Sequence, residues 1–332
     1  MTASETASAR GFNLGEAITR GLEQALEEDE RALLFGEDVG RLGGVFRITQ
    51  GLQNKFGSDR VFDTPASEAG IVGISVGLAL NGFRPIVEIQ FDGFVFPAMN
   101  QICAHVARYT QRVGEPGALP MVIRLPVGGR FGGIELHSEN PEAYFCHTPN
   151  LRVVAASQPE TAQALIVAAA RAGEPVMFLE PKRLYRRGRV PDDARITDVA
   201  IDKARMVREG SDLLIVTYGP SVPFALDAAE AVAEEGLSVA VLDLVSLAPI
   251  DEEAVLRAAA ATRRVLVLSE SIRRCSVASE IAALVSTELF SELERPVKVV
   301  TSPNAPTPLA IHEDTYYPQP HEIVAAVKEL AK

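Results

Sequence analysis

A carboxylate at the start of an apolar segment is the first residue that could do chemistry. Glu68 lies in the run VFDTPASEAG (residues 61–70), after a short extended piece and a proline turn. Ser67 is a favoured N-cap residue, so Glu68 would occupy the first turn of a helix, where a carboxylate suits the helix dipole. On position alone, an ordinary first-turn acid is the simpler interpretation. The chemical meaning of Glu68 depends on the groups that the fold brings to it.

A histidine in a glycine-rich loop is the second candidate. Residues 128–142 read GGRFGGIELHSENPE and present His137 among polar neighbours, after an expected strand at Met121–Leu125. Loops that follow strands carry the sites of many α/β proteins, and imidazole titrates near neutrality. His137 could therefore exchange protons with a substrate or an intermediate, although a loop histidine held by its neighbours is an equally good interpretation. We interpret His147 as structural.

Aromatic residues cluster at the end of another expected strand. The segment IQFDGFVFP (residues 89–97) holds Phe91, Phe94 and Phe96, and Gln90 precedes them. In a chain with 6% aromatic residues and no tryptophan, this cluster could form a wall that stacks on a ring. Core packing is the simpler role for at least two of the three phenylalanines.

One motif points to different chemistry. The run GISVG (residues 73–77) fits the G-x-S-x-G pattern of hydrolase nucleophiles, which requires a strand that leads directly into a sharp turn. Ser75 would instead lie inside a helix that has already begun. Gly70, Gly73 and Gly77 share one helical face, where missing side chains permit close packing of another element. We expect Ser75 to be structural and keep a serine hydrolase as an alternative of a different class.

Length and composition narrow the class of protein. The chain has 332 residues, of which 47% are hydrophobic and 23% charged, as in soluble globular proteins. Its net charge of −12 argues against nucleic acid as the main partner. Three scattered cysteines without a C-x-x-C motif indicate neither a disulfide framework nor a zinc site, so a reducing cytoplasm is the expected compartment. The apolar runs are too short to span a membrane.

The first half of the chain predicts an α/β domain that would hold these groups. The expected strands are Ala32–Phe35, Arg84–Gln90, Met121–Leu125, Val153–Ala155 and Val176–Leu179. The expected helices are Gly15–Glu27, Pro97–Arg108 and a segment that ends at Ala172 and opens with a capping box of Ser157 and Glu160. Residues 1–11 are small and polar, and we expect them to be disordered.

The second half alternates strands and helices even more regularly. A charged, proline-marked stretch at 188–203 is typical of a linker. The expected strands beyond it are Leu213–Tyr218, Ser238–Leu244, Val265–Ser269 and Val297–Thr301. Such alternation implies a parallel sheet covered by helices. We therefore predict an α/β fold of two doubly wound domains, at residues 12–187 and 204–332.

Several long segments, in order, resemble one family. They are FDTPASEAGIVGISVG (62–77), EIQFDGFVFPAMNQI (88–102), LHSENPEAYFCHTPNLRVV (136–154) and FLEPKRLYR (178–186). They are similar to the β subunit of the thiamine-dependent, decarboxylating first component of 2-oxoacid dehydrogenase complexes. Branched-chain members resemble the chain most, with pyruvate dehydrogenase close behind.

The resemblance implies a fold and a set of site residues. Residues 12–187 would form the transketolase-like pyrimidine-binding domain and residues 204–332 the transketolase C-terminal domain. Glu68 matches the glutamate that bonds N1′ of the aminopyrimidine of thiamine diphosphate and so promotes proton removal from the thiazolium ring. His137 matches a histidine implicated in reductive acylation of lipoyl. Three further residues are expected beside the cofactor: Phe94, Gln90 and Phe91. Phe94 stands where branched-chain members often carry tyrosine, so a hydrogen bond from that position is in doubt.

The resemblance also implies a partner. The chain contains neither Gly-Asp-Gly nor Asn-Asn, the signals that usually hold the diphosphate of this cofactor through Mg²⁺. A separate α subunit would supply that half of the site in an α2β2 heterotetramer, so we expect no divalent metal ligands on this chain. Some relatives bind a structural potassium ion in this subunit. The matching residues Ala169, Ala172 and Glu174 form no obvious ligand set, and this point stays open.

The implied reaction is oxidative decarboxylation of a 2-oxoacid, with transfer of the acyl group to lipoyl on an acyltransferase core. The C-terminal domain would supply the docking surface for that core. The segments at 88–102 and 178–186 favour 3-methyl-2-oxobutanoate and its homologues as substrates, while pyruvate and acetoin enzymes share the scaffold. Besides the hydrolase, a non-catalytic scaffold subunit is the remaining alternative.

Overall fold

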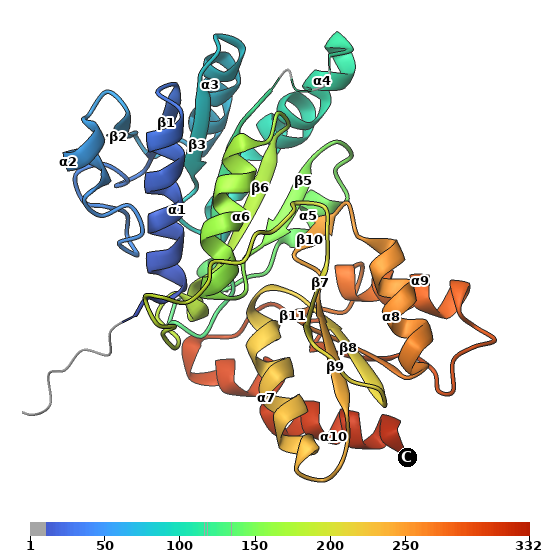
Figure 1. Cartoon of the computed structure of the whole chain (residues 1–332). Helices are drawn as coiled ribbons and strands as arrows, with labels where there is room; N and C mark the ends of the chain where they lie inside the picture. Colours follow the sequence, from blue (N-terminus) through green and yellow to red (C-terminus); the bar gives the residue numbers. More distant parts are fainter. Residues whose placement is uncertain (1–10, 116, 118, 134) are drawn as a thin grey trace, which may run out of the picture.

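Two α/β units build the protein. The computed structural model describes residues 11–332 except for 116, 118 and 134, and the predicted disordered segment 1–11 lies outside the described residues apart from its last residue. In the described part, one sheet has seven strands and the other five (Figure 1). The predicted fold class of two helix-covered, mainly parallel sheets is confirmed.

The first sheet has the strand order β10-β5-β6-β4-β3-β1-β2. Its strands are β1 Ala32–Gly36, β2 Val61–Asp63, β3 Arg84–Glu88, β4 Val122–Val127, β5 Arg152–Ala155, β6 Val176–Pro181 and β10 Ser246–Ala248. All neighbours are parallel except β10, which pairs antiparallel with β5. This last strand comes from beyond the predicted linker, so the second half of the chain completes the sheet of the first half.

Helices cover both faces of the first sheet. They are α1 Leu14–Glu28, α2 Leu52–Phe56, α3 Glu68–Leu80, η1 Asp92–Ala98, η2 Gln101–Val106, α4 Ala107–Val113, η3 Glu135–His137, α5 Glu142–Cys146, α6 Pro159–Arg171 and η4 Lys182–Leu184. Alternate residues of β1 show the two faces, because Leu34 packs in the cluster of α1 and α6 whereas Phe35 packs with α3 and η2. Helices α1 and α6 lie side by side (Figure 1).

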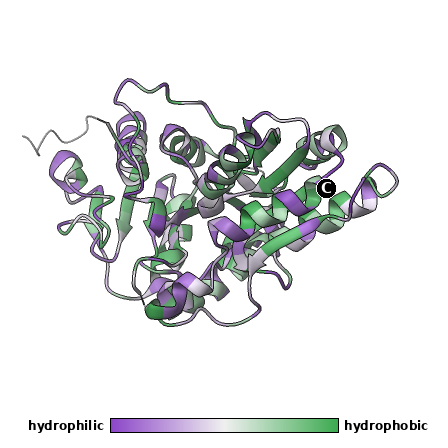
Figure 2. Cartoon of the chain, turned by 90° about the horizontal axis from the view of Figure 1, so that it is seen from below, coloured by the Kyte–Doolittle hydropathy of each residue, from purple (hydrophilic) through white to green (hydrophobic). Residues whose placement is uncertain are grey.

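The second sheet has the order β12-β11-β8-β9-β7, in which only β7 is antiparallel to its neighbour. Its strands are β7 Arg205–Arg208, β8 Leu213–Thr217, β9 Val239–Asp243, β11 Val265–Ile272 and β12 Lys298–Ser302. Its helices are η5 Gly219–Ser221, α7 Val222–Ala233, α8 Glu252–Thr262, α9 Val277–Glu288, η6 Ala310–Thr315 and α10 Pro320–Ala331. The strands are largely hydrophobic, while hydrophilic residues gather on outer helices and loops (Figure 2).

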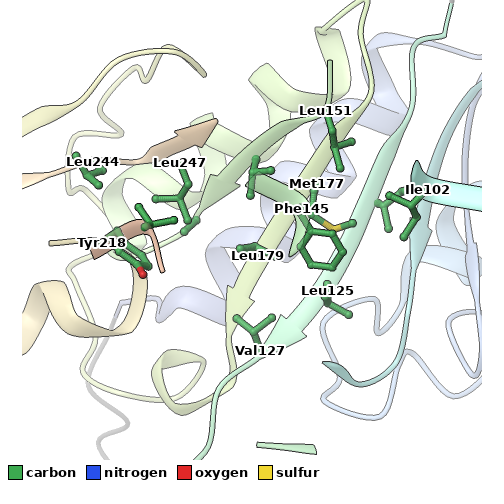
Figure 3. Packing of buried hydrophobic residues seen from close by; sticks show 14 of the residues in the cluster. Ile102, Leu125, Val127, Phe145, Leu151, Met177, Leu179, Tyr218, Leu244 and Leu247 are labelled. Atoms are coloured by element: carbon green, nitrogen blue, oxygen red, sulfur yellow. The ribbon is translucent and has the colours of Figure 1, made fainter. Parts of the chain in front are cut away.

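One hydrophobic core crosses from one unit to the other. Leu244 and Leu247, from the second half of the chain, lie in the same buried cluster as Phe145 of α5 and Leu179 of β6 (Figure 3). Polar contacts reinforce this junction, since the buried Tyr218 hydroxyl donates to the Glu142 carboxylate at 2.7 Å. The described parts of the two units therefore share a hydrophobic core and pack directly against each other.

One local prediction holds in part and two need correction. Ser67 is the N-cap residue of α3, as predicted, but its side chain makes no capping hydrogen bond. The capping box predicted for Ser157 and Glu160 is wrong, because Gln158 is the N-cap of α6 and the Ser157 hydroxyl donates to Asp243 of β9 instead. The helix predicted at Pro97–Arg108 is divided among η1, η2 and α4, since Pro97 lies inside a 3₁₀ turn.

A buried arginine joins the ends of three strands in the first sheet. Arg124 on β4 is 0% exposed and donates from Nη1 to Glu88 on β3 at 2.6 Å. Its Nε and Nη2 donate to both oxygens of Glu180 on β6, at 2.7 and 2.9 Å. The Tyr185 hydroxyl donates to Glu180 as well, at 2.7 Å. This network fixes the carboxyl ends of the strands from which the candidate site residues emerge.

Replacing Arg124 by methionine would leave two buried carboxylates without a cation. We expect Arg124→Met to lower the free energy of unfolding by about 3–5 kcal/mol, visible as a lower urea midpoint. Arg257→Met is the matched control, because that arginine is 70% exposed in its pair with Glu253 and should change stability by less than about 0.5 kcal/mol. Equal midpoints for the two variants would contradict the stabilising role of Arg124.

Candidate active site

Two carboxyl groups meet at the carboxyl edge of the first sheet. Glu37 directly follows β1, and Glu68 is the first residue of α3, as predicted for it. The two carboxyl groups lie close enough for the charge of Glu68 to act on Glu37. Burial and the charge of Glu68 raise the pKa of Glu37 to about 7, with a further contribution from Asp38. Such a pair can hold or release a proton near neutral pH.

Aromatic rings surround His137. The imidazole stacks on Phe91 with ring centroids 4.1 Å apart and an interplanar angle of 18°, and Phe94 meets it edge-on at 5.0 Å. Phe46 extends the cluster by an edge contact with Phe91 at 5.5 Å. The structure thus brings together His137, Phe91 and Phe94, which the sequence predicted as separate candidates. Phe96 lies apart and is paired with Tyr144.

The stack depends on close backbone approach. A Cβ atom at Gly93 would collide with the carbonyl oxygen of Leu136, so only glycine lets the η1 segment pack against η3. The helix α3, which begins with Glu68, also packs on η1. Segment Asp92–Ala98 therefore contacts both the helix that begins with Glu68 and the ring of His137.

A buried ion pair holds this segment in place. Asp92 is 1% exposed and accepts hydrogen bonds from the Lys182 ammonium group and from the backbone N–H of Glu139. Lys182 follows β6, and Glu139 lies just beyond His137. One carboxylate therefore ties η1 to the end of β6 and to the loop that carries the histidine.

Polar atoms without partners identify the open part of the site. Nδ1 of His137 and Oε1 of Glu37 are buried, and neither has a hydrogen-bond partner among the described residues. Gln90 is engaged, because its side-chain amide donates to Asp38 at 3.0 Å. A buried polar atom without a partner carries a cost that a bound ligand can remove. His137 and Glu37 are thus better suited than Gln90 to receive a ligand.

Ser75 is excluded as a nucleophile. Its side chain is fully buried within α3, and its hydroxyl donates to the carbonyl oxygen of Ile71 at 2.7 Å. The serine is part of a helix rather than of a strand-to-helix turn, as the sequence analysis expected. This geometry removes the observation on which a serine hydrolase would rest.

Two further features are absent from the described ranges. No cluster of three or more His, Cys, Asp or Glu side chains there could hold a metal ion. No helix there is both long and apolar enough to cross a membrane.

A cavity of about 910 Å³ lies between the two units. His147, Cys103 and Cys275 line it, and its wall reaches Glu139 and Thr307. His137, Phe91 and Glu68 do not line this cavity, so it is separate from the candidate site. The chemistry described above therefore lies elsewhere.

Sequence reasoning missed residues whose roles depend on tertiary contacts. Glu37 carried one usable signal, because an acidic residue directly after a buried parallel strand lies at the edge where α/β proteins place their sites. Asp92 and Lys182 carried none, since each resembles an ordinary surface charge until the fold buries them together. Phe46 likewise lies outside every predicted strand and helix.

Comparisons with known proteins agree with this architecture. The family model "Transketolase, pyrimidine binding domain" matches residues 10–188, and "Transketolase, C-terminal domain" matches residues 202–323. The chain is 47% identical over 313 residues to the pyruvate dehydrogenase E1 component subunit beta of Leifsonia xyli subsp. xyli, covering 94% of this chain and 92% of that one. It is 41% identical to the 2-oxoisovalerate dehydrogenase subunit beta of Bacillus subtilis, with 96% and 98% covered.

The chain belongs to the E1 beta subunits of the 2-oxoacid dehydrogenases. The family predicted from the four sequence segments is therefore confirmed. The named relatives include both a pyruvate and a 2-oxoisovalerate enzyme, so the family is fixed more closely than the substrate. In this E1 beta chain the carboxyl pair and the stacked histidine both belong to the pyrimidine-binding domain.

A solved structure shows the same fold. The protein described as "Split gene transketolase, inactive beta4 tetramer" superposes with a TM-score of 0.77 and covers 97% of this chain and 98% of its own, at 22% identity. At that identity the likeness concerns the fold of the E1 beta chain alone.

The raised pKa of Glu37 predicts that the free energy of unfolding depends on pH. Because the pKa of Glu37 is raised from 4.5 to about 7, the folded chain binds this proton more tightly than the unfolded chain. The resulting stabilisation is complete below pH 4.5 and is lost as the pH rises through about 7. Since Glu37 is only partly buried, we expect about 1 kcal/mol in total.

Glu37→Gln should remove this component when urea unfolding is measured from pH 5 to pH 8. The difference between the wild-type and variant free energies of unfolding should then decrease as the pH rises toward about 7 and stay constant above it. Glu288→Gln, at an exposed position that ends α9, should leave the wild-type curve unchanged. Parallel curves for wild type and Glu37→Gln would refute the assignment.

Proposed function

We propose that this chain is the β subunit of a decarboxylating 2-oxoacid dehydrogenase component that acts with thiamine diphosphate. The observation that carries the proposal is that α3, which begins with Glu68, and the stacked His137 both pack against one segment, η1. Carboxyl and imidazole groups are side chains that enzymes commonly use for proton transfer. The E1 beta membership supports the same reaction class.

The residues present fit the pyrimidine half of thiamine diphosphate. Glu68 would hold the ring by a hydrogen bond from its carboxyl group, while Phe91 and Phe94 would offer apolar surface beside it. When bound, the cofactor supplies the electron sink that decarboxylation of a 2-oxoacid requires. Glu37 would keep a proton available to Glu68, because the two carboxyl groups cannot both ionise at low cost when they are close together and partly buried.

His137 is the group of this chain that would act on the acyl acceptor. Its ring plane is fixed by the stack on Phe91 and by the edge of Phe94, and Nδ1 has no hydrogen-bond partner in the described part of the chain. An imidazole whose Nδ1 has no hydrogen-bond partner can give or accept a proton at that atom without first breaking another hydrogen bond. We assign to it the proton transfers that accompany acyl transfer to lipoyl.

An α subunit is the partner that this chain requires. Helix α3 carries apolar residues on all sides after Glu68, yet Ile74 is 61% exposed and a Cβ at Gly77 would meet no atom within 4 Å. A helix that is apolar all round is normally buried, so another chain should cover this face. We propose an α2β2 heterotetramer, with the acyltransferase core docking on the C-terminal domain.

The metal would belong to the partner. The sequence contains neither Gly-Asp-Gly nor Asn-Asn, so the diphosphate and its Mg²⁺ are assigned to the α subunit. A structural potassium ion on this chain stays an open proposal. Of the three residues expected beside it, Glu174 makes an ion pair with Arg152 at 2.6 Å.

The proposed substrate is 3-methyl-2-oxobutanoate or a homologue, on the strength of the segments at 88–102 and 178–186. Pyruvate is the second candidate, since a pyruvate dehydrogenase subunit is 47% identical to the chain and a 2-oxoisovalerate subunit 41%. A pocket shared with an α subunit is shaped by both chains, so side-chain selectivity needs a direct comparison of substrates.

Activity should appear only in the mixture of subunits. With an α subunit, thiamine diphosphate and Mg²⁺, the chain should reduce an artificial electron acceptor when a 2-oxoacid is added. Glu68→Gln should lower kcat by about 100-fold or more, because the proton-holding carboxyl is lost. Ser75→Ala should retain activity, since its hydroxyl bonds only within α3. An inactive but well-formed wild-type heterotetramer, whichever 2-oxoacid is supplied, would favour the scaffold alternative.

Assembly should depend on the open face of α3. Gly77→Leu places a bulky side chain where this chain has free space, so the subunit should fold while its affinity for the α subunit falls by about tenfold or more. Ala231→Leu, at an exposed position on α7, is the control. Analytical ultracentrifugation of the mixtures measures both, and unchanged assembly by Gly77→Leu would place the partner on another surface.

A further inference from the structure

The residue after His137 is held by the other half of the protein. The Tyr317 hydroxyl donates to the carbonyl oxygen of Ser138 at 2.7 Å, and the Thr307 hydroxyl donates to the same oxygen at 3.3 Å. All three residues are buried, and Tyr317 is only 1% exposed. Two donors use both lone pairs of one carbonyl, so the orientation of this peptide group is set from the C-terminal domain.

A glycine makes room for the tyrosine. A Cβ atom at Gly129 would collide with the hydroxyl of Tyr317 and would lie 2.7 Å from Oε1 of Glu313. The Tyr317 ring therefore lies against Gly129 at the start of the loop, while its hydroxyl binds Ser138 near the end of the same loop. The contact needs both this glycine and the tyrosine, which indicates a specific fit rather than a chance surface contact.

The first domain holds the next residue. The backbone N–H of Glu139 donates to Asp92, and the carbonyl oxygen of Glu139 accepts from the N–H of Gly128 at 2.7 Å. Ser138 and Glu139 are thus anchored from the two halves of the protein. His137 precedes them, and its Nδ1 makes no hydrogen bond within the described residues. Its orientation must therefore come from ring stacking and from the backbone that follows it.

We propose that Tyr317, assisted by Thr307, is a positioning residue for His137. The C-terminal domain would thus contribute to the chemistry of the first domain through a hydroxyl that never touches substrate. Burial raises the pKa of Tyr317, so the hydroxyl remains a donor across the physiological range. The effect of Tyr317 on catalysis rests on the function proposed above for His137. Its effect on the position of the His137 ring does not.

Tyr317→Phe tests the proposal, because it removes the donor and keeps the ring. Tyr316→Phe is the matched control, since its hydroxyl donates to a different carbonyl, that of Ala305, at 2.6 Å. In the complex with the α subunit, acylation of a free lipoyl domain should fall about tenfold in Tyr317→Phe. Reduction of an artificial electron acceptor, which bypasses lipoyl, should stay within about twofold. Tyr316→Phe should change neither rate.

A second readout does not depend on activity. The full chain has five histidines, and diethylpyrocarbonate labelling resolved by mass spectrometry reports on each of them. Labelling of His137 should become about threefold faster or more in Tyr317→Phe, because a freed loop opens more often. The other four histidines serve as internal references, and Tyr316→Phe should match wild type.

Unchanged labelling of His137 together with unchanged lipoyl acylation in a folded Tyr317→Phe chain would overturn the positioning role of Tyr317. If that variant does not fold, Thr307→Val, which removes only the longer of the two hydrogen bonds, must shift both readouts in the same direction. If the wild-type complex does not decarboxylate any 2-oxoacid, the proposed function fails, while the labelling of His137 still decides the positioning role.

Discussion

The burial of Arg124 between two carboxylates is the constraint on which the site depends. A guanidinium group removed from water costs several kcal/mol unless its donors are satisfied. Here its planar fork bonds both oxygens of Glu180 and one oxygen of Glu88, with every distance between 2.6 and 2.9 Å. Because these residues lie on three adjacent strands, the carboxyl ends of the strands cannot shift independently without exposing an unpaired buried charge.

The chemical groups begin where this network ends. Phe91 lies just beyond Glu88, Lys182 just beyond Glu180, and the loop that carries His137 follows the strand of Arg124. Asp92 then joins the three chain segments a second time, through Lys182 and the backbone of the loop. Two successive layers of buried ion pairs thus fix the histidine and its aromatic wall before any ligand arrives, which is the preorganisation that a catalytic site requires.

The parts of this arrangement that the sequence predicts are those with local signals. Glu68 could be found because a turn and an apolar helix frame it, and His137 because a glycine-rich loop after a strand presents it. Glu37, Asp92 and Tyr317 act through partners distant in the chain, and no spacing reveals such a pairing. Ser157 shows the opposite failure: its spacing from Glu160 matches a capping box, but the carboxylate of Asp243 offers its hydroxyl a buried partner. Tertiary burial decided between two locally equivalent hydrogen bonds.

The two halves of the chain also need each other for a physical reason. Strand β10 closes the edge of the first sheet, and Tyr317 reaches across to the loop beside His137. A rigid-body displacement of the C-terminal domain would therefore break a sheet edge and release the loop that carries His137 together. The α3 face, in contrast, has no such anchor among the residues that the structure describes and exposes Ile74 beside Gly77, which has open space next to it. Rigidity toward the second domain and openness toward solvent are what a subunit that completes its site with a partner should combine, since the fixed half can then serve as a template for the half that docks.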